Sequence, residues 1–132
     1  MIQEVLRLYP PAWLMIREPY ADDRIGGYLI PAGTSLLISP WVTHRRCDVW
    51  NDPLEFRPER FLGDRVRERH RFAWYPFGGG PRVCLGQGFA MAELKTVLAL
   101  VSQRHRLEFV SDDPIPPSPR LTLEPGRDLI VR

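Results

Sequence analysis

The sequence contains few cysteines and no long apolar run, and both shortages exclude classes of protein. Cys47 and Cys84 lie far apart with no C-x-x-C pair beside either, which argues against a disulfide framework or a zinc site. No segment approaches the roughly 20 consecutive apolar residues that a membrane span needs. Glu4 and Arg7 interrupt the start of the chain, where a signal peptide would be apolar. We therefore expect a cytoplasmic protein without a membrane segment.

A concentrated block of positive charge is also missing. The 132 residues carry 18 Lys and Arg against 16 Asp and Glu, and the basic side chains are spread along the whole chain. Proteins that track a phosphate backbone concentrate their basic residues, so nucleic acid is not an expected partner. With 44% hydrophobic and 26% charged residues, the composition is typical of a folded globular protein of at most one domain.

Proline, in contrast, is abundant, with 14 residues. Because proline breaks helices and is confined to the edges of sheets, much of the chain is expected to be irregular. Residues 1–9 carry apolar side chains at spacings of three and four, which predicts a helix that ends at Pro10 and Pro11. No Ser, Thr, Asp or Asn precedes this helix as a cap, so we expect it to be cut from a longer segment.

Short apolar runs follow, and they predict a small antiparallel sheet of three strands, over residues 13–16, 28–30 and 35–38. A short helix is expected over 40–46, and a long loop over 48–74. The strongest helix signal covers 86–104, where an apolar stripe from Phe89 to Val101 is expected to pack against the rest of the protein. The tail, 107–132, is predicted to form short strands.

A glycine-rich loop, residues 77–86, places Cys84 at the start of that long helix. Glycines allow the backbone to turn tightly and leave no side chain in the way of a flat ligand. The helix N-terminus contributes about half a positive charge, which favours the thiolate that a metal requires. Arg82 can pair with a carboxylate on the ligand. Nothing of this kind surrounds Cys47, which we interpret as structural.

The loop resembles the cysteine-ligand signature of the cytochrome P-450 family, F-x-x-G-x-R-x-C-x-G, at Phe77, Gly80, Arg82, Cys84 and Gly86. Residues 4–7, EVLR, resemble the family's E-x-x-R motif, and residues 58–61 resemble its P-E-R-F segment. The resemblance implies an α+β chain, the C-terminal part of the mainly α P-450 fold. Its elements would be the K helix, a small sheet, the meander, the ligand loop, the L helix and C-terminal strands. Residues 1–132 would then form a partial domain whose N-terminal two thirds are absent.

The resemblance also implies roles for individual residues. Cys84 would be the axial ligand of haem b, iron protoporphyrin IX. The other cofactor-binding residues would be Phe77, Gly78, Arg82, Gly86, Arg17 and His44, the last two beside a propionate. A buried ion network would join Glu4, Arg7 and Arg60. The substrate-lining residues would be Ala12, Trp13, Leu14, Met15 and Leu121.

The implied activity is oxidation of an apolar organic substrate by a bacterial monooxygenase. Electrons would come from a ferredoxin or a flavoprotein reductase. Because the distal, oxygen-activating part of the fold is not expected in this chain, the chain alone is predicted to be inactive. Two alternatives remain open, a non-catalytic haem-binding remnant or pseudoenzyme, and an interaction module that docks a partner through the proline-rich segment 114–119.

Overall fold

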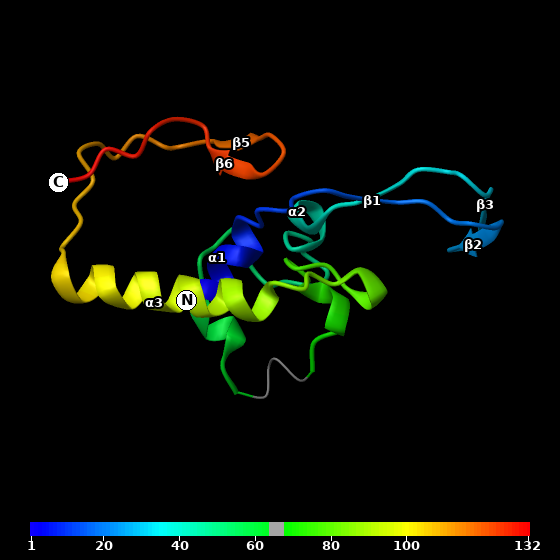
Figure 1. The fold of residues 1–132 in the computed structure, drawn as a ribbon, viewed down its shortest axis with the longest axis horizontal. Coiled ribbons are helices and arrows are strands. Elements are labelled where there is room, and N and C mark those ends of the chain that lie inside the picture. Colours follow the sequence, from blue (N-terminus) through cyan, green and yellow to red (C-terminus); the bar gives the residue numbers. More distant parts are fainter. Residues whose placement is uncertain (64–67) are drawn as a thin grey trace.

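The computed structural model describes residues 1–63 and 68–132. These residues form helices and short antiparallel strands, which confirms the predicted α+β class (Figure 1). In chain order the elements are α1 (Ile2–Leu8), β1 (Met15–Arg17), β2 (Asp23–Ile25), β3 (Tyr28–Ile30), β4 (Leu36–Ile38), α2 (Pro40–Thr43), η1 (Pro58–Phe61), η3 (Arg71–Ala73), η4 (Gly80–Arg82), α3 (Gln87–Arg104), β5 (Pro117–Pro119) and β6 (Leu123–Pro125). Elements α3 and β2–β3 lie towards opposite ends of the long axis, with α1 beside one end of α3 and α2 between α1 and β2–β3 (Figure 1).

The helices follow the local signals of the sequence. Helix α1 ends just before the two prolines, and α3 begins directly after Gly86, so both predicted helices are confirmed within one or two residues. Helix α2 is shorter than predicted. Its first residue is Pro40, whose missing N–H costs nothing there, and the Ser39 hydroxyl caps it by accepting the Val42 N–H at 3.3 Å.

The strands differ from the prediction of one three-stranded sheet. Strand β1 pairs with β4, and β2 pairs with β3, in two separate antiparallel ladders. Strand β2 was missed because Asp23–Ile25 carries two charged residues and no apolar alternation. The β2–β3 turn is made by Gly26 and Gly27, both at positive φ, as a two-residue hairpin requires. A third pair, β5 with β6, confirms short strands in the tail.

The predicted loop over 48–74 contains two short 3₁₀ turns, η1 and η3, in its described part; residues 64–67 of this prediction lie outside the described residues. Below the loop, the buried interior is small and unusually polar. Its hydrophobic members include Leu6, Leu8, Trp50, Ala73, Pro10 and Pro40, and its polar members are Glu4, Arg7, His44 and Arg60. Ion pairs and hydrogen bonds therefore occupy much of the centre of this chain.

Helix α3 buries none of its residues in this chain. The described residues therefore supply only part of the expected packing of its apolar stripe, and Phe89 is 75% exposed. One side of the helix meets α1 in an apolar groove of about 340 Å³, lined by Met1, Ile2, Val5, Leu6, Leu94, Val97, Leu98 and Val101. None of the helices in the described ranges combines the length and the apolar character that crossing a bilayer takes.

Candidate functional site

Cys84 lies on the glycine-rich loop directly before α3. The loop turns at Gly78 and Gly80, whose φ values of +75° and +68° are accessible to glycine without strain. Across the loop, the Cys84 N–H donates to the Phe77 carbonyl at 2.9 Å. The Cys84 side chain itself is exposed. The backbone thus holds an accessible thiol at the N-terminus of an 18-residue helix.

A hollow of about 390 Å³ lies beside this thiol. Most of its lining is apolar, with Arg82 and Glu93 as its charged members, and it is bounded by Leu6, Pro11, Ala12, Met15, Pro76, Phe77, Gly78, Arg82, Cys84, Ala90, Glu93 and Leu94. A second hollow, of about 710 Å³, is lined by both Arg17 and Arg82. The structure therefore brings these two predicted arginines together beside the cysteine loop. Gly86 lies beside the sulfur, and a Cβ there would be in ordinary van der Waals contact with Cys84 Sγ, at 3.9 Å.

The predicted substrate-lining residues divide into two groups. Ala12 and Met15 line the hollow beside Cys84, whereas Trp13, Leu14 and Leu121 do not. The Trp13 indole N–H instead donates to the Arg120 carbonyl at 2.9 Å, which ties the segment after α1 to the β5–β6 turn. Leu121 on that turn is 98% exposed.

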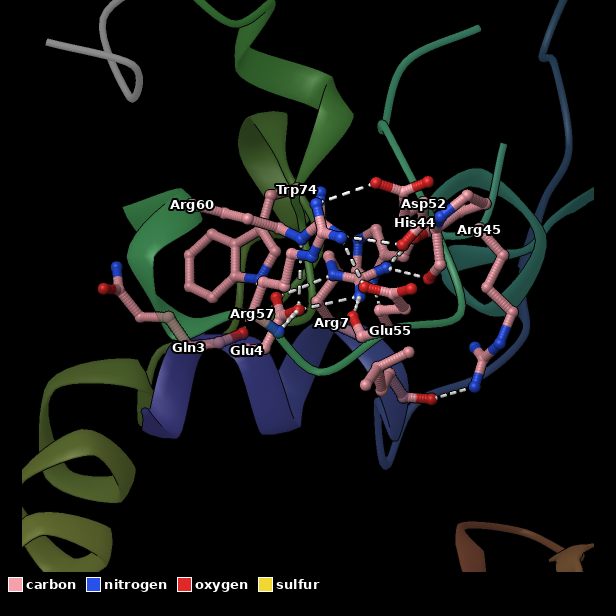
Figure 2. Close-up of polar contacts among 12 residues, drawn as sticks. Gln3, Glu4, Arg7, His44, Arg45, Asp52, Glu55, Arg57, Arg60 and Trp74 are labelled. Carbon is pink, nitrogen blue, oxygen red and sulfur yellow. Dashed lines mark hydrogen bonds and ion pairs between the residues drawn. The ribbon is translucent and has the colours of Figure 1, made fainter. Parts of the chain in front are cut away.

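A buried ion cluster lies on the other side of α1, and it joins the three residues predicted to form a network (Figure 2). Arg7 donates from Nε and Nη2 to the two Glu4 carboxylate oxygens at 2.7 and 2.8 Å. Arg60 Nε lies 3.3 Å from Glu4 Oε1. Glu4 and Arg7 are 0% exposed, so this pair is shielded from water and not an ordinary helix-surface pair.

Arg7 also binds the loop that crosses over α1. Its guanidinium donates to the carbonyls of His44 and Pro53, both at 2.7 Å, and to that of Glu55 at 3.0 Å. Arg60 donates to the carbonyls of Asn51 and Asp52. Because five backbone carbonyls from residues 44–55 converge on two guanidinium groups, the cluster fixes the irregular loop against α1.

The charge state of Glu4 follows from these contacts. Burial by itself raises the pKa of Glu4, but the Arg7 hydrogen bonds, the Arg57 backbone N–H at 2.8 Å and the charges of Arg7 and Arg60 outweigh it, so the pKa lies below its ordinary value. Glu4 is therefore an anion at neutral pH, and the cluster contains one buried negative charge between two positive ones.

Comparison with known proteins assigns this arrangement to a family, because the family model described as cytochrome P-450 matches residues 1–131. The chain belongs to the cytochrome P-450 family. It is 42% identical over 111 residues to cytochrome P-450 4c21 of Blattella germanica, a match that covers 84% of this chain and 22% of that protein. It is also 42% identical over 107 residues to the cyclooctat-9-en-7-ol 5-monooxygenase of Streptomyces melanosporofaciens, covering 81% of this chain and 23% of the relative.

Solved P-450 structures share the fold of this chain. The haem domain of cytochrome P-450DA matches 99% of the chain with a TM-score of 0.91 and 32% identity, over 30% of its own length. This confirms the predicted fold. The chain spans less than a third of the length of the P-450 proteins it matches. Members of this family are haem-thiolate monooxygenases.

The P-450 chain has residues suited to such a cofactor. The exposed Cys84 sulfur before α3 could ligate the iron of a haem, and the mainly apolar hollow beside it could contact the macrocycle. Arg17 and Arg82 line one hollow and would offer cations to carboxylates at the edge of such a cofactor. The chemistry of the lining residues therefore fits a haem with a cysteine ligand.

The P-450 resemblance led us to expect His44 beside a propionate, and the structure changes that role. His44 is 0% exposed, its Nδ1 lies 3.2 Å from the Arg7 carbonyl, and its Nε2 accepts the Tyr75 N–H at 2.9 Å. Both ring nitrogens are thus engaged by the backbone, and neither is available to a carboxylate. Burial lowers the pKa of His44 to about 4, the hydrogen bond to Arg7 opposes this, and the charges of Arg7 and Arg45 add to the lowering.

Two further residues, Arg45 and Tyr75, contact α1 and His44 respectively, and neither was identified from the sequence. Arg45 packs its guanidinium 3.2 Å from the centroid of the Trp41 ring and donates to the Leu8 carbonyl; burial lowers its pKa to about 10. Tyr75 donates its backbone N–H to His44 Nε2 at 2.9 Å. The sequence does not distinguish the partly buried Arg45 from the neighbouring Arg46, which is exposed. A hydrogen bond from a backbone N–H, as at Tyr75, does not depend on the residue type and so has no sequence signal.

Proposed function

We propose that Cys84 ligates haem iron and that this chain forms the thiolate side of a monooxygenase acting on apolar organic substrates. The observation that carries the proposal is the exposed thiol at the start of α3, beside a mainly apolar hollow with Arg82 in its lining. With O₂ and two electrons from a ferredoxin or flavoprotein reductase, a thiolate-ligated haem supplies the insertion of one oxygen atom into the substrate and the reduction of the other to water.

The residues of this chain would hold and shield the cofactor. The α3 N-terminus would stabilise the Cys84 thiolate electrostatically. Arg17 and Arg82 would bind the propionates, and Ala12 and Met15 would form an apolar wall that keeps water from the site and contacts the substrate. The buried ion cluster of Glu4, Arg7 and Arg60 would have a structural role, because it does not line the hollow beside Cys84.

Reconstitution with haem tests the ligand assignment. The full chain is titrated with haem, reduced and exposed to CO, and the Soret band is recorded. We expect a thiolate-type band for the natural chain and for Cys47→Ser, and its loss in Cys84→Ala. Cys47 is the matched control because it is the other exposed free cysteine. A thiolate band that survives Cys84→Ala would refute the assignment, and so would the absence of this band from the natural chain.

Haem binding without turnover by this chain is a second candidate. The chain covers less than a third of its relatives, and the stripe of α3 is exposed among the described residues. Water reaching the cofactor would compete with oxidation of the substrate. The haem-loaded chain, given an electron donor and O₂, is therefore assayed for oxidised apolar substrate; a thiolate spectrum without product supports this candidate, and product refutes it.

A further inference from the structure

The His44 ring lies between α1 and the segment that leads to Cys84. Its surroundings define its protonation. A backbone N–H can only donate, so Nε2, 2.9 Å from the Tyr75 nitrogen, must be the acceptor. The ring proton then resides on Nδ1, where it donates to the Arg7 carbonyl at 3.2 Å. The contacts thus require one neutral tautomer of His44.

His44 is in turn held by the ion cluster. The Arg7 guanidinium donates to the His44 carbonyl at 2.7 Å, while the Arg7 carbonyl binds the ring. One arginine therefore contacts both the main chain and the side chain of His44. Since Glu4 orients that guanidinium through two hydrogen bonds, the position of the His44 ring depends on the cluster (Figure 2).

On its other side, His44 contacts Tyr75, the first residue of a hydrogen-bonded segment that leads to Cys84. Tyr75 accepts the Gly78 N–H through its carbonyl at 2.9 Å, which closes the turn at the start of the ligand loop. The Phe77 carbonyl inside this turn accepts the Cys84 N–H, also at 2.9 Å. The Tyr75 ring stands edge-on to His44, with centroids 5.2 Å apart, and its hydroxyl lies 2.7 Å from the Thr43 hydroxyl.

We propose that His44 is a positioning residue for Cys84. The neutral His44 ring holds the Tyr75 end of the ligand loop against α1 and so sets the position of the Cys84 sulfur. The inference rests on the proposed function, in which that sulfur ligates haem. The physical reason is that removing the Nε2 acceptor leaves the partly buried Tyr75 N–H without its partner, and the loop shifts to satisfy it. A ligand must be held to within roughly 0.5 Å, so a small shift at Tyr75 matters at Cys84.

Two amide substitutions separate the contacts of His44. Asparagine places its carboxamide near the position of Nδ1 and can still bind the Arg7 carbonyl, but it does not reach Tyr75. Glutamine reaches the position of Nε2 and offers an oxygen to the Tyr75 N–H. His44→Gln should therefore rescue what His44→Asn loses. His105→Asn, at an exposed position after α3, is the matched control.

The first readout is the CO spectrum of the reduced, haem-loaded full chain, run beside Cys84→Ala. We expect the ratio of thiolate-ligated to thiol-ligated haem to fall about tenfold in His44→Asn, the order of change that one unpartnered, partly buried N–H produces. His44→Gln and His105→Asn should keep the natural ratio. If the natural chain shows no thiolate band, the proposed function fails, and the second readout then decides the role of His44 separately.

That second readout needs no haem, because it follows amide hydrogen exchange at Tyr75 and Cys84. His44→Asn should speed exchange at both amides about tenfold, while amides in the middle of α3 keep their rates. Faster exchange throughout the chain would mean that His44 only contributes to global stability, and it would overturn the inference. So would equal behaviour of His44→Asn and His44→Gln, or no protection of the Tyr75 amide in the natural chain.

Discussion

Replacing Arg7 by methionine tests whether the buried ion cluster holds the chain together. The substitution keeps an unbranched side chain, shorter than that of arginine, but removes five hydrogen bonds, two to Glu4 and three to backbone carbonyls. It also leaves the Glu4 carboxylate buried with one guanidinium in place of two. Removing one partner of a buried ion pair costs roughly 3–5 kcal/mol, a large part of the roughly 5–15 kcal/mol that stabilises a domain.

The same substitution at Arg46 is the matched control. Arg46 forms an equally bidentate pair with Asp48, but both side chains are more than half exposed, at 56% and 58%. An exposed pair contributes about 0–1 kcal/mol. We therefore expect Arg46→Met to change the free energy of unfolding little, while Arg7→Met lowers it several-fold more.

Urea unfolding, followed by tryptophan fluorescence and circular dichroism, measures both variants. Trp50 is a suitable reporter, because it is 2% exposed and its ring centroid lies 5.0 Å from the Arg7 guanidinium carbon. The loss in the double variant Glu4→Gln with Arg7→Met should be smaller than the sum of the two single losses, because both substitutions break the same Glu4–Arg7 ion pair. A loss in Arg7→Met no larger than in Arg46→Met would refute the role of the buried cluster.

Two further predictions concern pH and the glycine loop. In the folded chain the pKa of His44 is about 4, below its ordinary 6.5. Between these two pH values the unfolded chain binds a proton that the folded chain does not. The free energy of unfolding should therefore fall as the pH drops from 6.5 to 4, by about 3 kcal/mol in all. Urea unfolding at several pH values checks this, and an equally steep decline in His44→Gln would contradict it. Gly78→Ala places a side chain at φ +75° and should cost about 1–2 kcal/mol, whereas Gly88→Ala inside α3, with open space around its Cβ, should stabilise by about 0.5–1 kcal/mol. Thermal unfolding compares the two, and equal shifts would show that the loop backbone is not under this constraint.

The parts of the fold that the sequence predicted depend on neighbours along the chain. The helix of 86–104 shows its apolar stripe locally, and the ligand loop shows its glycines and Cys84 within ten residues. Strand β2 carries no such pattern, because its pairing with β3 comes from the two-glycine turn and backbone hydrogen bonds. Arg7 and Glu4 share one helix, but their burial depends on carbonyls some forty to fifty residues later in the chain.

By itself, the sequence determined the family resemblance and the candidate ligand Cys84, because both depend on short motifs of neighbouring residues. The tertiary structure alone decided what surrounds them. It placed Arg17 near Arg82, and it buried His44 with Nε2 on the backbone of Tyr75, 31 residues away. The physical reason is that chain segments that meet only on folding set the partners of a side chain and its exposure to water. His44, which in sequence resembles a cofactor contact, is therefore a neutral, buried side chain that links α1 to the cysteine loop.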